Sequence, residues 1–172
     1  MKIIVDVVDF IFDKKQVFRV SRILSCPTKM TDPNNITEQP ESRWRLRFNN
    51  FELAYFTFCR LMKRYETNSD DEVVLIAIVQ AFEFTYEIAW ILMRDYLKEE
   101  GFGETNGSKQ TLRVAWQAGL IKDIDKWMDA VKNRNLTSHT YSESILQESV
   151  DYIVNIFFPI VQELFNDLEG RL

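Results

Sequence analysis

The single histidine of the chain, His139, follows an arginine by five positions and precedes a tyrosine by two. Arg134, His139 and Tyr141 place a guanidinium, an imidazole and a phenol in one short stretch, beside the small polar side chains of Asn135 and Ser138. A guanidinium binds phosphate through paired hydrogen bonds, and an imidazole transfers protons near neutral pH. No other stretch of the sequence combines these groups, so we take it as the candidate functional site.

These side chains could not converge on one ligand along an unbroken α-helix, because positions five apart face different sides of it. Thr137 and Ser138 are poor helix-interior residues, and a capping-box spacing begins at Ser144. We therefore predict a helix end between Arg134 and His139, with the site between two helices. The alternative is structural: the arginine covers apolar surface, the histidine satisfies a backbone carbonyl and the tyrosine packs as an amphipathic aromatic.

Apolar residues recur at helical spacing through most of the chain, and glycine and proline are scarce. The pattern predicts an all-α, up-and-down bundle of four principal helices plus a short one. The long helices are expected over residues 44–62, 72–96, 123–134 and 144–165, and the short one over 108–118. The helix over 72–96 is expected to be largely buried. Pro159 is expected to interrupt the last helix, Gly119 to end the short one, and Trp116 and Trp127 to lie in the core.

Glu83, Tyr86 and Glu87 share one face of the predicted helix over residues 72–96, and Trp90 continues that face. Two carboxylates on one face could bind a metal, but the sequence offers no matching Glu-x-x-His pair. We therefore expect no metal and no cofactor. The three residues are expected to support the site by orienting Arg134 or a partner's basic group, or else to be solvated.

The net charge of −5 is unevenly distributed. Residues 102–134 are mildly basic, whereas the segment after position 142 is acidic and would repel a polyanion. This distribution argues against broad, non-specific binding of nucleic acid, but it allows a local phosphate site around Arg134.

Residues 1–42 differ in character from the rest and end in a segment rich in turn-forming residues. We predict a poorly ordered extension over residues 1–42, a bundle over 43–172, and Met30 as an alternative start. The apolar stretch near the N-terminus is too short to span a bilayer and has no cleavage signal. Cys26 and Cys59 have neither metal-ligand nor disulfide-framework spacing, so we expect reduced thiols, a cytoplasmic protein and no membrane partner.

The arginine, four intervening residues and histidine of the candidate site resemble the defining pattern of HEPN domains. Asn135 matches the polar residue that follows this arginine in the family, and Tyr141 matches a tyrosine of its bacterial toxin branch. Residues 80–90 and 118–121 resemble the branch called nucleotidyltransferase substrate-binding proteins. The resemblance covers about residues 43–168.

The resemblance implies a helical bundle that forms a homodimer and is encoded beside a minimal nucleotidyltransferase. Many HEPN proteins are toxins that cleave RNA without a metal. In some systems the nucleotidyltransferase silences the toxin by adding AMP to the tyrosine that corresponds to Tyr141. The resemblance thus assigns phosphate binding to Arg134, proton transfer to His139, and substrate binding or modification to Asn135, Ser138 and Tyr141.

The single histidine also limits how one chain could cleave RNA. Cleaving RNA without a metal requires a base, an acid and positive charge at the phosphate, but each chain has one histidine. Unless a tyrosine or water fills the second role, a two-fold dimer would supply it from a second copy of His139. Two alternatives remain: a non-catalytic subunit that binds nucleotide or acceptor for the nucleotidyltransferase, and a scaffold whose motif is structural.

Overall fold

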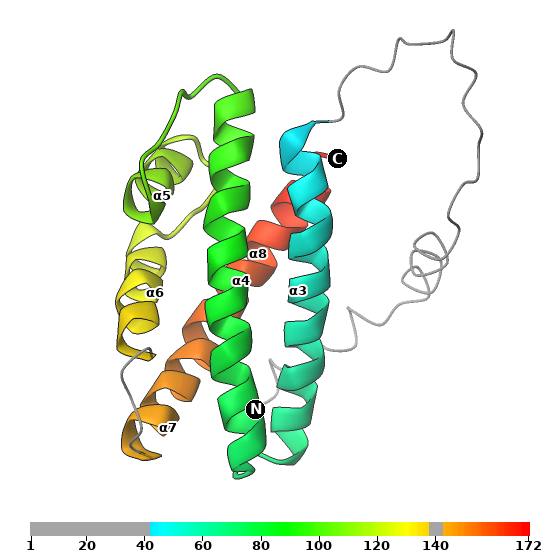
Figure 1. Ribbon diagram of the computed structural model, residues 1–172, viewed down its shortest axis with the longest axis vertical. Coiled ribbons are helices and arrows are strands. Elements are labelled where there is room, and N and C mark those ends of the chain that lie inside the picture. The colour runs from blue at the N-terminus through cyan, green and yellow to red at the C-terminus, as the bar shows by residue number, and fades with distance from the viewer. Residues whose placement is uncertain (1–41, 138–142) are drawn as a thin grey trace, which may run out of the picture. The chain divides into compact units, whose positions relative to one another are not determined.

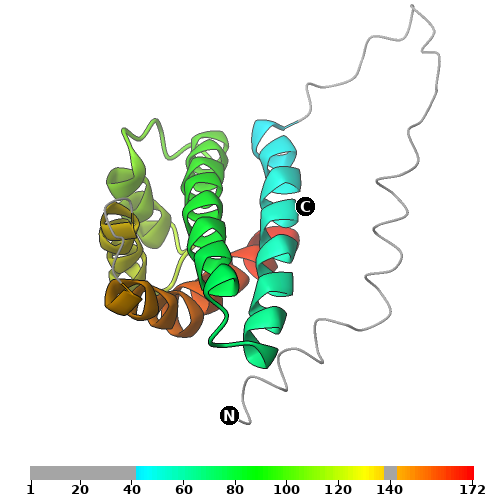
Figure 2. The ribbon, with the colours of Figure 1, turned by 60° about the horizontal axis from the view of Figure 1, so that its bottom comes forward.

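The computed structural model describes residues 42–137 and 143–172, and every element in these ranges is helical. The elements are α3 (Arg43–Thr67), α4 (Glu72–Glu99), α5 (Ser108–Gln117), α6 (Ile124–Thr137), α7 (Glu143–Tyr152), the π-helical turn η1 (Ile153–Phe157) and α8 (Phe158–Glu169). In Figure 1, α3 and α4 lie side by side and antiparallel, and the continuous path from α7 to α8 crosses behind them. Figure 2 shows α4 between α3 and the α5–α6 pair. The predicted bundle of four principal helices and a short one is confirmed.

Local sequence signals set the ends of α4 and α5. The Asp71 side chain accepts a hydrogen bond from the backbone N–H of Val73 at 2.9 Å and so caps the N-terminus of α4. Gly119 has a φ of 71°, which suits glycine, and the backbone bond from Leu120 N to the Ala115 carbonyl closes the end of α5 at 2.9 Å. The predicted stop at Gly119 is therefore confirmed.

Aromatic rings from distant elements form much of the core. Tyr55 of α3 stacks on Phe165 of α8 with ring centroids 4.3 Å apart. Phe157, which is fully buried, packs edge-on against Phe82 of α4 at 4.6 Å and also contacts Trp127 of α6. Because aromatic side chains bury large apolar areas, these contacts tie the last helical segment to α3, α4 and α6.

The last helical segment is interrupted just before Pro159, as the sequence predicts. The backbone N–H of Phe158 bonds to the carbonyl of Ile153, the i→i+5 pattern of a π-turn. Proline has no N–H and cannot continue the regular α pattern, so a wide turn forms beside it. This turn carries Phe157 into the core.

Two predictions about burial are wrong in part. Trp127 is 1% exposed, but Trp116 is 48% exposed because the inner face of α5 is formed by Thr111, Leu112 and Ala115. Helix α4 is less completely buried than predicted, because a second apolar stripe faces outward and includes Phe84, which is 63% exposed. The short helix α5, in contrast, buries a single apolar stripe.

Helix α4 is also the one helix in the described ranges that is long and apolar enough to cross a membrane by length and composition. Here it packs along α3 and contributes Ile78, Phe82, Leu92 and other side chains to the bundle core. The predicted extension over residues 1–42 and the alternative start at Met30 lie almost entirely outside the described residues, and both stay predictions.

Candidate functional site

Arg134 lies in the last turn of α6 and reaches across to α4. Its Nε atom donates a hydrogen bond to Oε1 of Glu87 at 3.0 Å. The side chains of Arg134 and Glu87 are 37% and 41% exposed, so the ion pair lies at the surface. A cation in the last turn of a helix also interacts favourably with the helix dipole. Arg134 is thus held in place yet accessible to an anion.

Glu87 is itself oriented by a second donor. Trp90, one turn further along α4, donates from its indole N–H to Oε2 of Glu87 at 2.8 Å. The guanidinium of Arg94 lies 5.6 Å from the Trp90 ring centroid, which is a cation–π distance. The carboxylate of Glu87 therefore uses one oxygen for Trp90 and the other for Arg134.

Tyr86 and Glu83 differ in their surroundings. Tyr86 is 2% exposed, and its hydroxyl has no hydrogen-bond partner in the described part of the chain. Burial raises the pKa of Tyr86, the charge of Glu87 raises it further, and the charge of Arg134 lowers it in part. Glu83 is half-buried one turn before Glu87. Of the three predicted supporting residues, Glu87 bonds directly to Arg134, as expected of a residue that orients it.

Of the remaining predicted site residues, the structure describes only Asn135. Asn135 follows Arg134 in α6 and is exposed. Ser138, His139 and Tyr141 lie between α6 and α7, outside the described residues. The structure therefore brings Arg134 and Glu87 together, and the roles of His139, Ser138 and Tyr141 stay predictions.

A contact between α6 and α7 fixes the two helices on either side of this segment. The hydroxyl of Tyr152, at the end of α7, donates to the backbone carbonyl of Lys126 in α6 at 3.0 Å. Burial raises the pKa of Tyr152, so the phenol stays protonated and remains a donor. Sequence reasoning missed this contact because helical periodicity does not show which hydroxyl reaches another helix.

A second unpredicted feature is a cluster of arginines around Asp95 of α4. Asp95 is 7% exposed and pairs with Arg43 at 3.5 Å, with Arg94 at 3.2 Å and with Arg47. Although burial raises the pKa of Asp95, hydrogen bonds from Arg47 and Arg94 outweigh it and lower the pKa below its ordinary value. This network connects α3 to α4 at the end of the helix pair that lies beyond Trp90.

No group of three or more metal-ligating side chains occurs within residues 42–137 and 143–172. A groove of about 540 Å³ lies between α3 and α4 and is open to solvent. Apolar side chains form most of its lining, among them Leu53 and Ala54 of α3 and Phe84, Ile88 and Ile91 of α4.

The family described as nucleotidyltransferase substrate binding protein like matches residues 46–170. The chain belongs to this family. The match includes α4, α6 and the whole segment that contains Arg134 and His139. The resemblance noted from the motif, to the HEPN-like branch of nucleotidyltransferase substrate-binding proteins, is thereby confirmed.

Individual relatives agree with the family match. A Haemophilus influenzae protein named probable ribonuclease HepT is 29% identical over 99 residues, which cover 53% of this chain and 68% of that protein. A solved structure of a Thermus thermophilus protein is 28% identical, with a TM-score of 0.57, and covers 70% of this chain and 97% of that one.

Two further solved structures share the fold at lower identity. A Haemophilus influenzae protein described as having the fold of a substrate binding domain of a nucleotidyltransferase is 24% identical, with a TM-score of 0.65 over 71% of this chain and 98% of that one. A tri-AMPylated Shewanella oneidensis HEPN toxin, solved in complex with its MNT antitoxin, is 12% identical, with a TM-score of 0.59. The match covers 74% of this chain and 96% of that one. These likenesses show that this family member has the HEPN-like helical fold.

Proposed function

We propose that this protein is a HEPN-type toxin that cleaves RNA without a metal. The observation that carries the proposal is the Arg134–Glu87 pair, which holds a half-exposed guanidinium at the end of α6, five residues before the one histidine. Arg134 binds the scissile phosphate and stabilises the charge that develops there. His139 transfers the proton, and Asn135 and Ser138 contact the substrate. The relative named probable ribonuclease supports this assignment.

The catalytic unit in this proposal is a homodimer. Attack by the 2′-hydroxyl needs a general base, and departure of the 5′-oxygen needs a general acid. One chain provides a single imidazole, so the second copy supplies the other across a two-fold axis. Arg134 of each copy faces the same phosphodiester.

A minimal nucleotidyltransferase is the proposed partner, and Tyr141 is the proposed site of silencing. Transfer of AMP forms a bond between the phenol oxygen and the α-phosphorus of ATP and releases pyrophosphate. The bulky anion would then occupy the place of the substrate phosphate near Arg134 and block RNA. The position of Tyr141, two residues after the histidine, supports this part of the proposal.

A second candidate function is a non-catalytic subunit that binds nucleotide or acceptor for the nucleotidyltransferase. The family description favours this function directly. The net charge of −5 also favours it, because a free ribonuclease would gain from a broader cationic surface.

Cleavage of a labelled RNA in EDTA separates the two candidates. The purified protein is compared with the variants His139→Ala and Arg134→Ala and with the control variant Arg60→Ala. Arg60 is an exposed arginine on α3, and its side chain donates a hydrogen bond to Thr57. We expect products with 2′,3′-cyclic phosphate ends from the parent and the control, and none from the other two variants. Intact mass shows whether Tyr141 is modified. Uncleaved RNA with unmodified protein would refute the ribonuclease and favour the binding subunit.

A further inference from the structure

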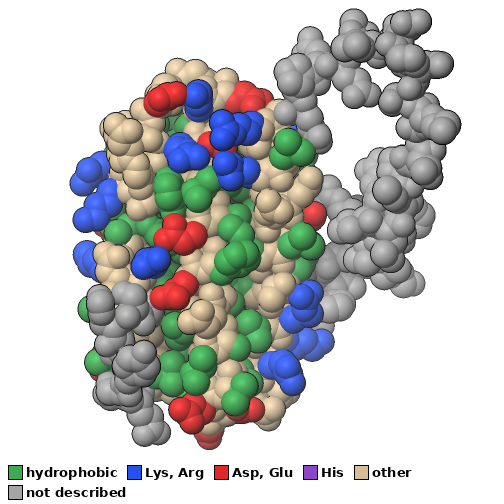
Figure 3. Space-filling model, viewed as in Figure 1, with side chains coloured by type: hydrophobic (Ala, Val, Ile, Leu, Met, Phe, Trp, Pro, Cys, Tyr) green, Lys and Arg blue, Asp and Glu red, His purple; other side chains and the backbone are tan. Residues whose placement is uncertain are grey.

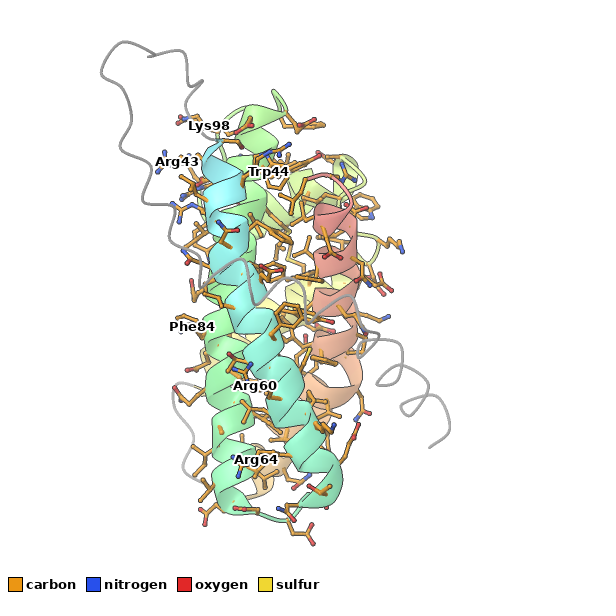
Figure 4. All side chains as sticks on the ribbon, turned by 90° about the vertical axis from the view of Figure 1, so that its right-hand side faces the viewer. Arg43, Trp44, Arg60, Arg64, Phe84 and Lys98 are labelled. Atoms are coloured by element: carbon orange, nitrogen blue, oxygen red, sulfur yellow. The ribbon has the colours of Figure 1, made fainter. Side chains whose placement is uncertain are left out.

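The outer side of α4 carries an aromatic ring and a guanidinium beyond the Arg134 site. The guanidinium carbon of Arg94 lies 5.6 Å from the centroid of the Trp90 ring, and both side chains are partly exposed. Figure 3 shows basic side chains gathered near this end of α3 and α4. Arg43 and Lys98 lie at the same end in Figure 4. The surface therefore combines a ring with several cations close to the candidate site.

We propose that Arg94 and Trp90, together with the arginines around Asp95, form an RNA subsite. It binds a nucleotide beyond the two that the scissile phosphate joins: the base stacks on the guanidinium plane of Arg94, and the arginines bind the adjacent phosphate. The inference rests on the proposed function, because it assigns where the strand lies outside the cleavage site. Proteins bind single-stranded RNA through stacking on aromatic rings and guanidinium planes and through positive charge along the backbone.

Asp95 fixes the orientation of Arg94. Nε of Arg94 donates to Oδ1 of Asp95 at 3.2 Å, and Nη2 lies 3.2 Å from the same oxygen. These two atoms form one side of the guanidinium, and further N–H donors lie on its other side. Asp95 is 7% exposed, whereas Arg94 is 33% exposed, so a ligand at the surface meets the guanidinium and not the carboxylate. Because Arg94 is already held over the Trp90 ring, it loses little side-chain entropy when it binds.

The subsite lies on the same stripe of α4 as the contact with Arg134. Glu87 and Arg94 are seven residues apart, which is nearly two helical turns and about 10.5 Å along the axis. Trp90 lies between them and donates its indole N–H to Glu87, which in turn bonds Arg134. A strand with its scissile phosphate at Arg134 therefore reaches Arg94 within its next few nucleotides.

The arginines around Asp95 supply positive charge for a phosphate. Arg43, Arg47 and Arg94 are 72%, 34% and 33% exposed, and all three share the one carboxylate of Asp95. One negative charge cannot neutralise three positive ones, so these four side chains keep a net positive charge. Guanidinium groups bind phosphate through charge-assisted hydrogen bonds, which suits this cluster to an RNA backbone.

Other acids at this end of α4 limit the positive charge to the neighbourhood of Arg94. Lys98 pairs with Glu104 at 2.6 Å, so their charges cancel. At about 100° per residue, Glu99 and Glu100 project about 140° and about 120° around α4 from Arg94, away from the stripe. Together with Asp95, these acids balance the four cations, so this end attracts no polyanion from a distance. The subsite therefore depends on local contacts with a strand already bound at Arg134.

The first experiment measures binding of an RNA that cannot be cleaved, a 2′-O-methyl oligonucleotide about ten nucleotides long, by calorimetric titration of the full-length protein. We compare the parent with Arg94→Gln and with Arg60→Gln, which removes the same charge from an exposed position on α3. Binding should be about tenfold weaker for Arg94→Gln and nearly unchanged for Arg60→Gln. Arg94→Lys keeps the charge but loses the planar surface, so it should restore only part of the binding. Circular dichroism checks that each variant is folded.

The second experiment separates a subsite from an indirect effect on Arg134. Arg94 contacts Trp90, and Trp90 holds Glu87, so a change at Arg94 could also displace Arg134. Such an indirect effect would weaken binding of a 2′-O-methyl dinucleotide and of the longer strand by the same factor. A subsite predicts that Arg94→Gln weakens binding of the longer strand alone, because the dinucleotide does not extend to Arg94. An equal loss for both lengths would overturn the subsite.

Three further outcomes overturn the proposal. They are a parent protein that does not bind the longer strand, a loss for Arg94→Gln no greater than for Arg60→Gln, and binding of ATP as tight as that of RNA with the same dependence on Arg94. The last outcome would mean that the site takes a single nucleotide.

Neither measurement depends on cleavage, so the subsite and the proposed function can fail separately. Binding that depends on Arg94 in a protein that does not cleave RNA would uphold the subsite and refute the ribonuclease. Cleavage of RNA together with binding that Arg94→Gln leaves unchanged would uphold the ribonuclease and refute the subsite.

Discussion

The Nε atom of Arg134 donates to Oε1 of Glu87, a residue 47 positions earlier in the chain, at 3.0 Å. This bond joins the end of α6 to the middle of α4, and the indole of Trp90 holds the other oxygen of the same carboxylate. Arg134 therefore does not depend on its own helix alone for its position. A side chain fixed by a neighbouring element is better prepared to bind a phosphate than one that samples many rotamers.

Replacing Glu87 with alanine should reduce RNA cleavage without unfolding the protein. The ion pair is about 40% exposed on both sides, so its loss should change the unfolding free energy by about 1 kcal/mol or less. Misplacing Arg134 should lower kcat/KM about 10- to 100-fold. Glu87→Gln, which still accepts hydrogen bonds, should recover part of the activity. Equal activity of the alanine variant and the parent would show that Glu87 does not position Arg134.

Asp95→Asn should destabilise the protein at neutral pH by about 1–3 kcal/mol, because Arg47 and Arg94 lose their buried charged acceptor. The folded-state pKa of Asp95 is lowered, so its stabilising contribution is present above the unfolded-state pKa of about 3.9 and is lost as the pH falls through the folded-state value. Urea unfolding of parent and variant at pH 7 and pH 3 measures this. The difference in unfolding free energy between parent and variant should be smaller at pH 3 than at pH 7. A larger difference at pH 3 would contradict the lowered pKa of Asp95 in the folded state.

Tyr152→Phe should cost about 1 kcal/mol of unfolding free energy, the usual net value of one hydrogen bond, because it removes the donor to the Lys126 carbonyl. The same change loosens α7 relative to α6, so RNA cleavage should fall while the helix content stays constant. Urea unfolding followed by circular dichroism gives the first quantity and initial cleavage rates give the second. A variant as stable and as active as the parent would remove Tyr152 from this role.

The sequence predicts those features that depend on neighbouring residues along the chain. Asp71 caps α4 through a bond to a residue two positions away, and Gly119 ends α5 with its own backbone angle. Pro159 disturbs the last helix because its missing N–H acts within one turn. The sequence also singles out Glu87, since it shares a helix face with Tyr86 and Glu83 that is expected to orient Arg134 or a partner's basic group, or else to be solvated.

The features that sequence reasoning missed depend on how the helices are rotated against one another. Arg47 and Asp95 are 48 positions apart, and no periodicity relates them. Apolar composition assigns the stripe that includes Phe84 to the core, because α4 is apolar on two sides and hydrophobicity alone does not show which side is covered. Assigning the second side requires the tertiary packing, which leaves Phe84 63% exposed.

Substitutions at Trp116 and Trp127 test which helix sides are covered by tertiary packing. The sequence predicts both side chains in the core, but the structure buries only Trp127. Trp127→Ala should cost about 3–5 kcal/mol, since its ring is 1% exposed and contacts Phe157. Trp116→Ala should change stability by about 0.5 kcal/mol or less, because half of its side chain is already in water. Urea unfolding of both variants measures the difference. A large cost at Trp116 would mean that another molecule or another part of the chain covers α5.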